Sequence, residues 1–172
     1  GLISGGAGLD SLTLSTANQA VVIGADISAI ETVTGTGSNA LTASNMVNTW
    51  VINATNQGVI NDSTVNEVNF VNFNELTGGT ANDDFIIGAS GNVDTLIGGD
   101  GTGVDSLSAR TGVINTWIFT DTKSSLMQDN DPAADELYVG DFSGIETYIT
   151  GNTNEWADVS ALSGDIEASS YV

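Results

Sequence analysis

The sequence predicts an all-β fold, specifically a right-handed parallel β-solenoid (a β-helix or β-roll) with Gly- and Asp-rich turns. Residues 78–108 read as three successive units of about ten residues, each opening on glycine and closing on a short apolar run. Glycine supplies the positive φ angles of tight turns, and the apolar runs are too short for a helix. β-branched residues and short alternations fill the rest of the chain, which favours strands throughout.

Strands are expected in order along the chain. Leu12 and Leu14 alternate with polar residues, and an apolar run follows at 21–23. A phrase of an apolar residue, Glu, an apolar residue, Thr and Gly then recurs around Glu31, Glu75 and Glu146, each time as a strand leading into a turn. We expect these three glutamates to recur at one place on the coil, on the outward face of their strands.

Composition bounds the class of protein. The 172 residues suffice for one domain with a core. With 22 acidic residues against only Arg110 and Lys123, the net charge is −20, which repels nucleic acid and attracts divalent cations. The chain contains no Cys and no His, and no apolar run approaches the ~18 residues of a membrane span. Because it begins at Gly1 without a signal peptide, we expect a module of something longer.

The acidic residues suggest what the turns bind. Aspartates stand at or just before apolar runs, behind turns rich in glycine, and calcium prefers six or more oxygen ligands that mix carboxylates with carbonyls. The predicted calcium ligands are Asp10, Asp83, Asp94 and Asp105, with Gly78, Gly99 and Asp100 in the turns. We expect Asp83, Asp94 and Asp105 to stack along one edge of the coil. The alternative is that such an Asp bonds only the backbone of its own turn.

The turns also match a known pattern, the nonapeptide G-G-x-G-x-D-x-U-x, in which U is a large apolar residue. Residues 5–13 match it at every fixed position, residues 100–108 depart only at the first, and residues 78–86 depart only at Ala81. The sequence here resembles the RTX (repeats-in-toxin) family of secreted bacterial proteins. The resemblance implies calcium binding, export and a parallel β-roll.

A longer repeat spans most of the chain. An Asn-Thr-Trp sequence followed by apolar residues occurs at 48–52 and again at 115–119. The single module of residues 1–172 therefore divides into one copy at 35–100, a second at 101–172, and the end of a preceding copy at 1–34. We expect Trp50 and Trp117 to be buried at equivalent places.

This longer unit resembles a repeat of very large, tandemly repeated bacterial surface proteins described as haemagglutinin- or adhesin-like. The resemblance implies a location outside the cell, at the bacterial surface or in a biofilm matrix. The second copy departs from the pattern by an acidic loop at 129–132 and by residues 151–156 in place of a Gly-Gly turn.

The leading hypothesis for function is a non-catalytic, calcium-binding structural or adhesive module of a large secreted protein. Open strand edges would let the module stack on neighbouring copies of itself, so that a homopolymer or fibre could form. One alternative is a carbohydrate-binding module in which Trp156, beside Glu155 and Asp158 in a polar turn, contacts a glycan or a host-cell ligand. Another is a polysaccharide lyase or epimerase on a β-helix; against it stand the presence of only two basic residues and the lack of His, Cys and a Ser-centred motif.

Overall fold

The structure, a computed structural model, describes residues 1–62, 67–120, 124–128, 136–151 and 155–162. The described residues form eighteen strands and no helix, so none of them forms a helix that could cross a membrane. The strands are β1 (Ile3–Ser4), β2 (Ser11–Thr13), β3 (Ala20–Val22), β4 (Ile27–Ser28), β5 (Thr32–Thr34), β6 (Ala40–Thr42), β7 (Asn48–Ala54), β8 (Gln57–Asp62), β9 (Glu67–Val71), β10 (Glu75–Thr77), β11 (Asp83–Ile87), β12 (Val93–Ile97), β13 (Ser106–Ser108), β14 (Asn115–Thr120), β15 (Ser124–Gln128), β16 (Glu136–Ser143), β17 (Thr147–Ile149) and β18 (Trp156–Ala161).

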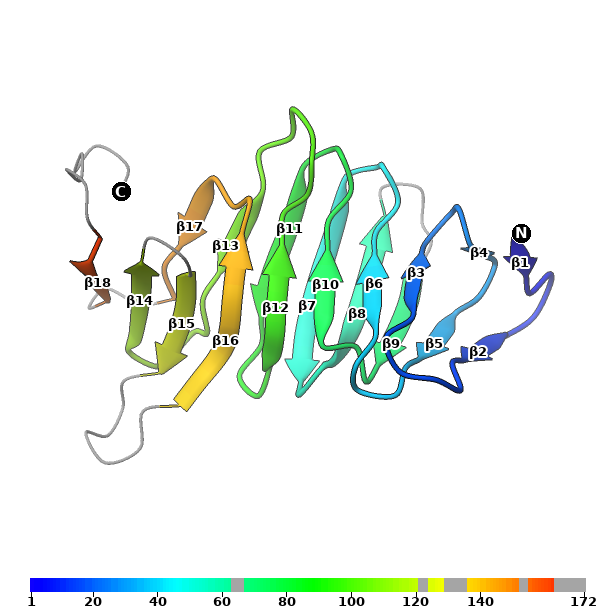
Figure 1. Ribbon diagram of the computed structural model, residues 1–172, viewed down its shortest axis with the longest axis horizontal. Helices are drawn as coiled ribbons and strands as arrows, with labels where there is room; N and C mark the ends of the chain where they lie inside the picture. Colours follow the sequence, from blue (N-terminus) through cyan, green and yellow to red (C-terminus); the bar gives the residue numbers. More distant parts are fainter. Residues whose placement is uncertain (63–66, 121–123, 129–135, 152–154, 163–172) are drawn as a thin grey trace.

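Two eight-stranded sheets make up most of the molecule (Figure 1). Sheet 1 has the order β2-β5-β9-β8-β7-β11-β13-β17, and sheet 2 has the order β3-β6-β10-β12-β16-β15-β14-β18. A separate two-stranded sheet joins β1 to β4 at the N-terminal end. Both large sheets are mixed, because β8 and β15 pair antiparallel with their neighbours while the remaining pairs are parallel.

The all-β prediction is confirmed, but the prediction of a single right-handed parallel β-solenoid is wrong. The sequence interpretation assigned each apolar run to a new coil, whereas β7, β8 and β9 follow one another as a meander within sheet 1. The turn from β7 to β8 has only Thr55 and Asn56 between the strands, and Asn56 adopts a φ of 53°. A two-residue hairpin needs positive φ, which Asn tolerates better than most residues.

A second meander, β14 to β16, lies in sheet 2. In the first meander Trp50 lies opposite Ile60, which lies opposite Val68. In the second, the corresponding row runs from Trp117 through Leu126 to Val139, and the six side chains of the two rows are all at most 5% exposed. The division of the chain into copies at 35 and 101 remains a prediction, but the two meanders have this row in common.

The core is built from the apolar side chains that alternate along the strands. Trp50 stacks on Phe85 with ring centroids 5.6 Å apart and meets Phe70 edge-on at the same distance. Trp117 packs edge-on against Phe142 and Tyr148. The predicted burial of both tryptophans is confirmed, since Trp50 is 0% and Trp117 4% exposed.

Replacing either buried tryptophan should destabilise the fold strongly. Trp50→Ala and Trp117→Ala each remove a ring that packs on two other aromatic rings, and we expect each to lower the free energy of unfolding by about 3–5 kcal/mol. Chemical denaturation followed by circular dichroism measures this. Trp156→Ala is the matched control, because Trp156 is 65% exposed; equal losses in all three variants would contradict the assigned burial.

Candidate functional site

The turns that carry the chain from sheet 2 to sheet 1 lie directly against one another. They are residues 78–82 between β10 and β11, 98–105 between β12 and β13, and 144–146 between β16 and β17. A Cβ atom on Gly78 would lie 1.9 Å from the Gly98 carbonyl oxygen, and one on Gly98 would lie 1.7 Å from that of Gly144. Only glycine allows so close an approach of backbones, which explains the glycine-rich turns.

Asp83 points into the turn that precedes it. Its side chain is fully buried, one carboxylate oxygen, Oδ2, accepts the peptide N–H of Gly79 at 2.7 Å, and the other, Oδ1, accepts a hydrogen bond from the Asn48 side-chain amide. The peptide N–H of Asp83 in turn donates to Oδ1 of Asp105, at 2.8 Å. Asp83 therefore links three turns through hydrogen bonds.

Asp105 repeats this arrangement one turn further along. Its peptide N–H donates to Oε2 of Glu146 at 2.8 Å. We call Asp83, Asp105 and Glu146 the acid ladder, because each later acid accepts the N–H of the earlier one. The same bond occurs near the N-terminus, where the N–H of Asp10 donates to Oε2 of Glu31 at 2.7 Å.

The acid ladder holds carboxyl groups in an environment that penalises charge. Burial raises the pKa of Asp83 to about 6, against the lowering effect of the hydrogen bonds from Asn48 and Gly79 and with a further raising effect of the Asp105 charge. Burial is also the main cause of the raised pKa of Asp105, to which the charges of Glu146 and Asp84 add. Proton uptake by the ladder is therefore coupled to folding.

The predicted stacking of Asp83, Asp94 and Asp105 along one edge is wrong. Asp83 and Asp105 do lie in neighbouring turns, joined by a hydrogen bond, but Asp94 lies within β12 of sheet 2 with its side chain exposed. The reason is that successive turns alternate sides, since residues 88–92 lead from sheet 1 to sheet 2 while the turns on either side of them lead back.

The remaining predicted ligands are spread over the turns. Gly78 and Gly99 lie in the stacked turns, where Gly99 has a φ of 124°. Asp100 is exposed in the same turn as Gly99. Asp10 is half-buried, and its Oδ2 atom is buried without a hydrogen-bond partner.

Calcium does not fit the acid ladder as it stands. Both oxygens of Asp83 accept N–H groups, whose partial positive charge opposes a cation at the same place. Within the part of the chain that the structure describes, no three acidic side chains come close enough together to hold a metal ion. The Oδ2 atom of Asp10 is a predicted ligand oxygen that is buried without a hydrogen-bond partner, and calcium binding itself remains a prediction.

Sequence reasoning missed the role of two asparagines and one glutamate. The side-chain amide of Asn48 donates to the Ser44 carbonyl as well as to Asp83, and that of Asn115 donates to the Arg110 carbonyl and to Glu155. Glu155 also accepts the peptide N–H of the residue four positions before it, Gly151, as Asp83 does from Gly79. In both places the acidic residue follows a glycine by four positions and lies beside an Asn-Thr-Trp strand. This shared spacing is the sequence feature that could have indicated the role of Glu155.

The last predicted contact, Trp156, is the first residue of β18 and does not lie in a turn as predicted; its side chain is 65% exposed. Its contact with a glycan remains a prediction. The acidic loop at 129–132 lies outside the described residues.

The predicted outward glutamates behave differently from one another. Glu146 is exposed, whereas Glu31 and Glu75 are half-buried. Glu31 and Glu146 accept peptide N–H groups from Asp10 and Asp105, so two of the three have a structural role within the turns.

Comparisons of this chain with protein-family models, with curated proteins and with solved structures found no match.

The acid ladder predicts a fold that is more stable in mild acid than at neutral pH. A carboxyl group whose pKa is raised in the folded state, here Asp83 from 3.8 to about 6, contributes stability that is fully present below pH 3.8 and is lost as the pH rises through about 6. The free energy of unfolding should therefore decrease from about pH 4 to about pH 7, as denaturant titrations at each pH would measure.

Two variants with the same change of charge separate the ladder from the general acidity of the chain. Asp83→Asn should flatten this pH dependence, because the buried titrating group is gone. Asp94→Asn, at an exposed position in β12, should keep it. A slope in Asp83→Asn as steep as in the unaltered protein would contradict the assignment.

Proposed function

We propose that this chain is a non-catalytic structural module of a larger extracellular protein of a bacterial surface or matrix, and that it stacks edge to edge with neighbouring copies of the same repeat. The observation that carries this proposal is that, among the described residues, both large sheets end on strands with one unpaired side. The outermost strands are β2 and β3 at one end of the elongated body and β17 and β18 at the other (Figure 1).

The backbone of β2 shows how a further strand would attach. The peptide N–H of Leu14, just after β2, donates to the carbonyl of Thr34 at 2.8 Å, so this residue faces β5. Because successive peptide groups of a strand point in opposite directions, the N–H of Thr13 faces the open side. An unpaired row of such groups is a template for another strand.

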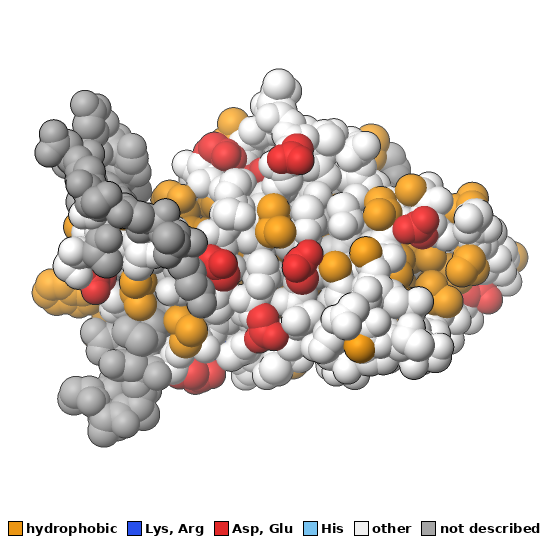
Figure 2. Space-filling view, in the orientation of Figure 1, with side chains coloured by type: hydrophobic (Ala, Val, Ile, Leu, Met, Phe, Trp, Pro, Cys, Tyr) orange, Lys and Arg blue, Asp and Glu red, His pale blue; other side chains and the backbone are white. Residues whose placement is uncertain are grey.

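Exposed apolar side chains support contacts at both ends. Leu2, Ile3 and Leu9 at the N-terminal end are 56%, 50% and 93% exposed, and Ile149 and Trp156 at the other end are 45% and 65% exposed. On the face shown in Figure 2, hydrophobic side chains lie near both ends of the long axis, and further hydrophobic and acidic side chains are scattered over the face. Burying such apolar surface favours association.

Assembly through the open edge of β2 should depend on one backbone group. Thr13→Pro removes the outward-facing N–H, and we expect it to weaken concentration-dependent self-association measured by analytical ultracentrifugation. Thr13→Ala is the matched control, since it shortens the same exposed side chain and retains the N–H. Equal association of both variants and the unaltered protein would argue against edge pairing at β2.

Calcium enters the proposal at the turn of residues 5–13, which matches the nonapeptide at every fixed position. Asp10 and the neighbouring turn carbonyls would hold the ion, which neutralises carboxylate repulsion there. The unpartnered Oδ2 of Asp10 supports this position over the acid ladder, where the oxygens already accept hydrogen bonds.

A calcium-specific rise in thermal stability is therefore expected. An ion that binds only the folded state raises the melting temperature by mass action, and we expect several degrees in millimolar calcium compared with equal magnesium. Asp10→Asn should abolish the difference between the two ions, whereas Asp94→Asn, with the same change of charge, should retain it. Identical melting curves in calcium and magnesium would rule out a specific site.

A further inference from the structure

Among the described residues, sheet 1 ends at both sides on open strands that run in the same direction. β2 is parallel to β5 and β9, both β9 and β7 are antiparallel to β8, and β7 leads through parallel pairs to β11, β13 and β17. A second copy shifted along the long axis of the body (Figure 1) therefore brings its β2 beside β17 as a parallel strand. We propose, on the basis of the edge-to-edge stacking proposed above, that copies join head to tail, with β17 of one copy paired to β2 of the next.

The backbone of β17 presents hydrogen-bonding groups to its open side. The peptide N–H of Thr147 donates to the Asp105 carbonyl at 3.0 Å, and the Ile149 carbonyl accepts the N–H of Ala109 at 2.9 Å. Thr147 and Ile149 therefore face β13. Because successive peptide groups of a strand point in opposite directions, the N–H and C=O groups of Tyr148 face the open side.

These groups match those on the open side of β2. The N–H of Leu14 bonds β5, so the alternate residues Ser11 and Thr13 present their peptide groups to the open side. In a parallel pair, a residue that faces the neighbouring strand bonds the two residues that flank its partner. With Tyr148 of one copy opposite Leu12 of the next, the Tyr148 N–H donates to the Ser11 carbonyl, and the Tyr148 carbonyl accepts the Thr13 N–H.

The same register continues a row of inward side chains from one copy into the next. Tyr148 lies opposite Leu107 at one end of sheet 1, and Leu12 lies opposite Val33 at the other. Leu107 and Val33 are fully buried, whereas Tyr148 and Leu12 pack against the core but are only partly buried. The Tyr148 ring is already positioned by Trp117, at a centroid distance of 5.4 Å. Joining the ends covers the exposed parts of Tyr148 and Leu12, which favours association.

Sheet 2 does not offer the same opening at its N-terminal end. In its outermost strand, β3, the N–H of Ile23 donates to the Thr42 carbonyl of β6, so Val22 faces the open side. The Val22 N–H donates to Oδ2 of Asp26 at 3.0 Å, and the Val22 carbonyl accepts the N–H groups of Ala25 and Asp26. A turn of the chain itself thus occupies part of this edge, which protects it from a further strand. The contact between copies therefore runs through sheet 1.

The two ends of the body have complementary outlines along its long axis. At the C-terminal end, β14 and β18 of sheet 2 extend beyond β17 of sheet 1, and at the N-terminal end β2 of sheet 1 extends beyond β3 of sheet 2 (Figure 1). The projecting β2 of one copy therefore has room beside β17 of another. Because such a contact uses different surfaces of the two copies, it can repeat from copy to copy and build a fibre.

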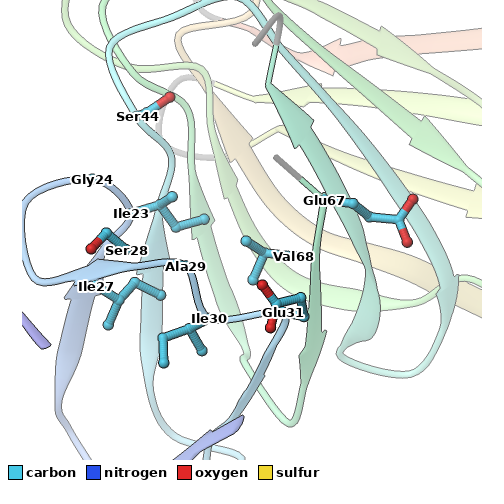
Figure 3. Close-up of a pocket in the computed structure, with 10 residues that line it drawn as sticks. All are labelled: Ile23, Gly24, Ile27, Ser28, Ala29, Ile30, Glu31, Ser44, Glu67 and Val68. Carbon is cyan, nitrogen blue, oxygen red and sulfur yellow. The ribbon is translucent and has the colours of Figure 1, made fainter. Parts of the chain in front are cut away.

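A cavity near the N-terminal end is not part of this contact. It has a volume of about 400 Å³ and lies between the segment that joins β3 to β5, Ser44 and β9 (Figure 3). Ile23, Ile27 and Val68 are among its apolar lining residues, and none of its described lining residues belongs to β2. Pairing at β2 therefore does not depend on this cavity.

Two variants, each blocked at one end, test the direction of pairing. Thr150 follows β17, and by the same alternation its N–H faces the open side, so Thr150→Pro removes this donor and places a ring in the path of an added strand. In the presence of a chelator, Thr13→Pro and Thr150→Pro should each stay monomeric in analytical ultracentrifugation. Their equimolar mixture should form pairs, because the first variant keeps β17 and the second keeps β2. Thr150→Ala is the matched control and should associate like the unaltered protein.

Cross-linking tests the register without changing the backbone. The chain contains no cysteine, and the proposed pair places the exposed side chains of Ile149 and Thr13 opposite each other. A mixture of Thr13→Cys and isotopically labelled Ile149→Cys should form disulfide-linked pairs with one copy of each under mild oxidation. Thr13→Cys alone should form none. Asp94→Cys, at an exposed position in β12, is the matched control and should not link to Thr13→Cys.

The outcomes separate this contact from stacking in general. Links between two copies of Thr13→Cys, or association of Thr150→Pro with itself, would indicate a two-fold contact between two β2 strands. That result, or the lack of mixed pairs in both experiments, would overturn head-to-tail pairing while leaving the proposed stacking in place. If the unaltered protein does not self-associate at all, both proposals fail. The cross-linking result decides the matter even where a proline variant does not fold.

Discussion

The fold depends on side-chain oxygens that accept the peptide N–H groups of the turns between the two sheets. At Gly79 and Asp83 such groups lie in buried places, where leaving one unpaired costs roughly 1–3 kcal/mol. The residues with this role are Asn39 for Thr36, Asp83 for Gly79, Asp105 for Asp83, Glu146 for Asp105 and Glu155 for Gly151. A carboxylate can serve two donors at once, as in Asp83, and the raised pKa of that group is the consequence of its burial.

The two meanders compensate for each other. A meander places three consecutive strands in one sheet, so a single one would leave the two sheets with unequal numbers of strands. The chain crosses between the sheets at each step from β9 to β14, and the second meander therefore falls in sheet 2. Both sheets therefore reach eight strands among the described residues.

The scarcity of basic residues gives Arg110 an unusual position in this molecule. An arginine in so acidic a chain would be expected on the surface, where it has many partners, yet it is buried over Tyr138. The Tyr138 hydroxyl itself donates to Oδ1 of Asn115 at 2.6 Å. The Arg110 guanidinium therefore packs on a ring that is hydrogen-bonded to the first residue of the second meander. The residue in the corresponding place before the first meander is Ser44, whose carbonyl accepts a hydrogen bond from the Asn48 amide as that of Arg110 does from the Asn115 amide.

The sequence by itself determined the all-β class, the glycine-rich turns and the burial of Trp50 and Trp117. These features are local, because alternation along a strand decides which side chains face the core and a close backbone contact admits only glycine. The sequence also suggested that an Asp in such a turn accepts hydrogen bonds from the backbone, as Asp83 does. The repeat of about ten residues, however, could not distinguish the buried Asp83 from the exposed Asp94.

Only the tertiary structure decided which strand pairs with which. An apolar run of five residues looks the same whether the next one folds back beside it, as β8 does on β7, or crosses to the other sheet, as β12 does after β11. As a result the Asp94 side chain is exposed, and Glu155 accepts a hydrogen bond from Asn115, 40 residues earlier in the chain. Such pairings depend on contacts between segments far apart in the chain, and no local pattern of residues records them.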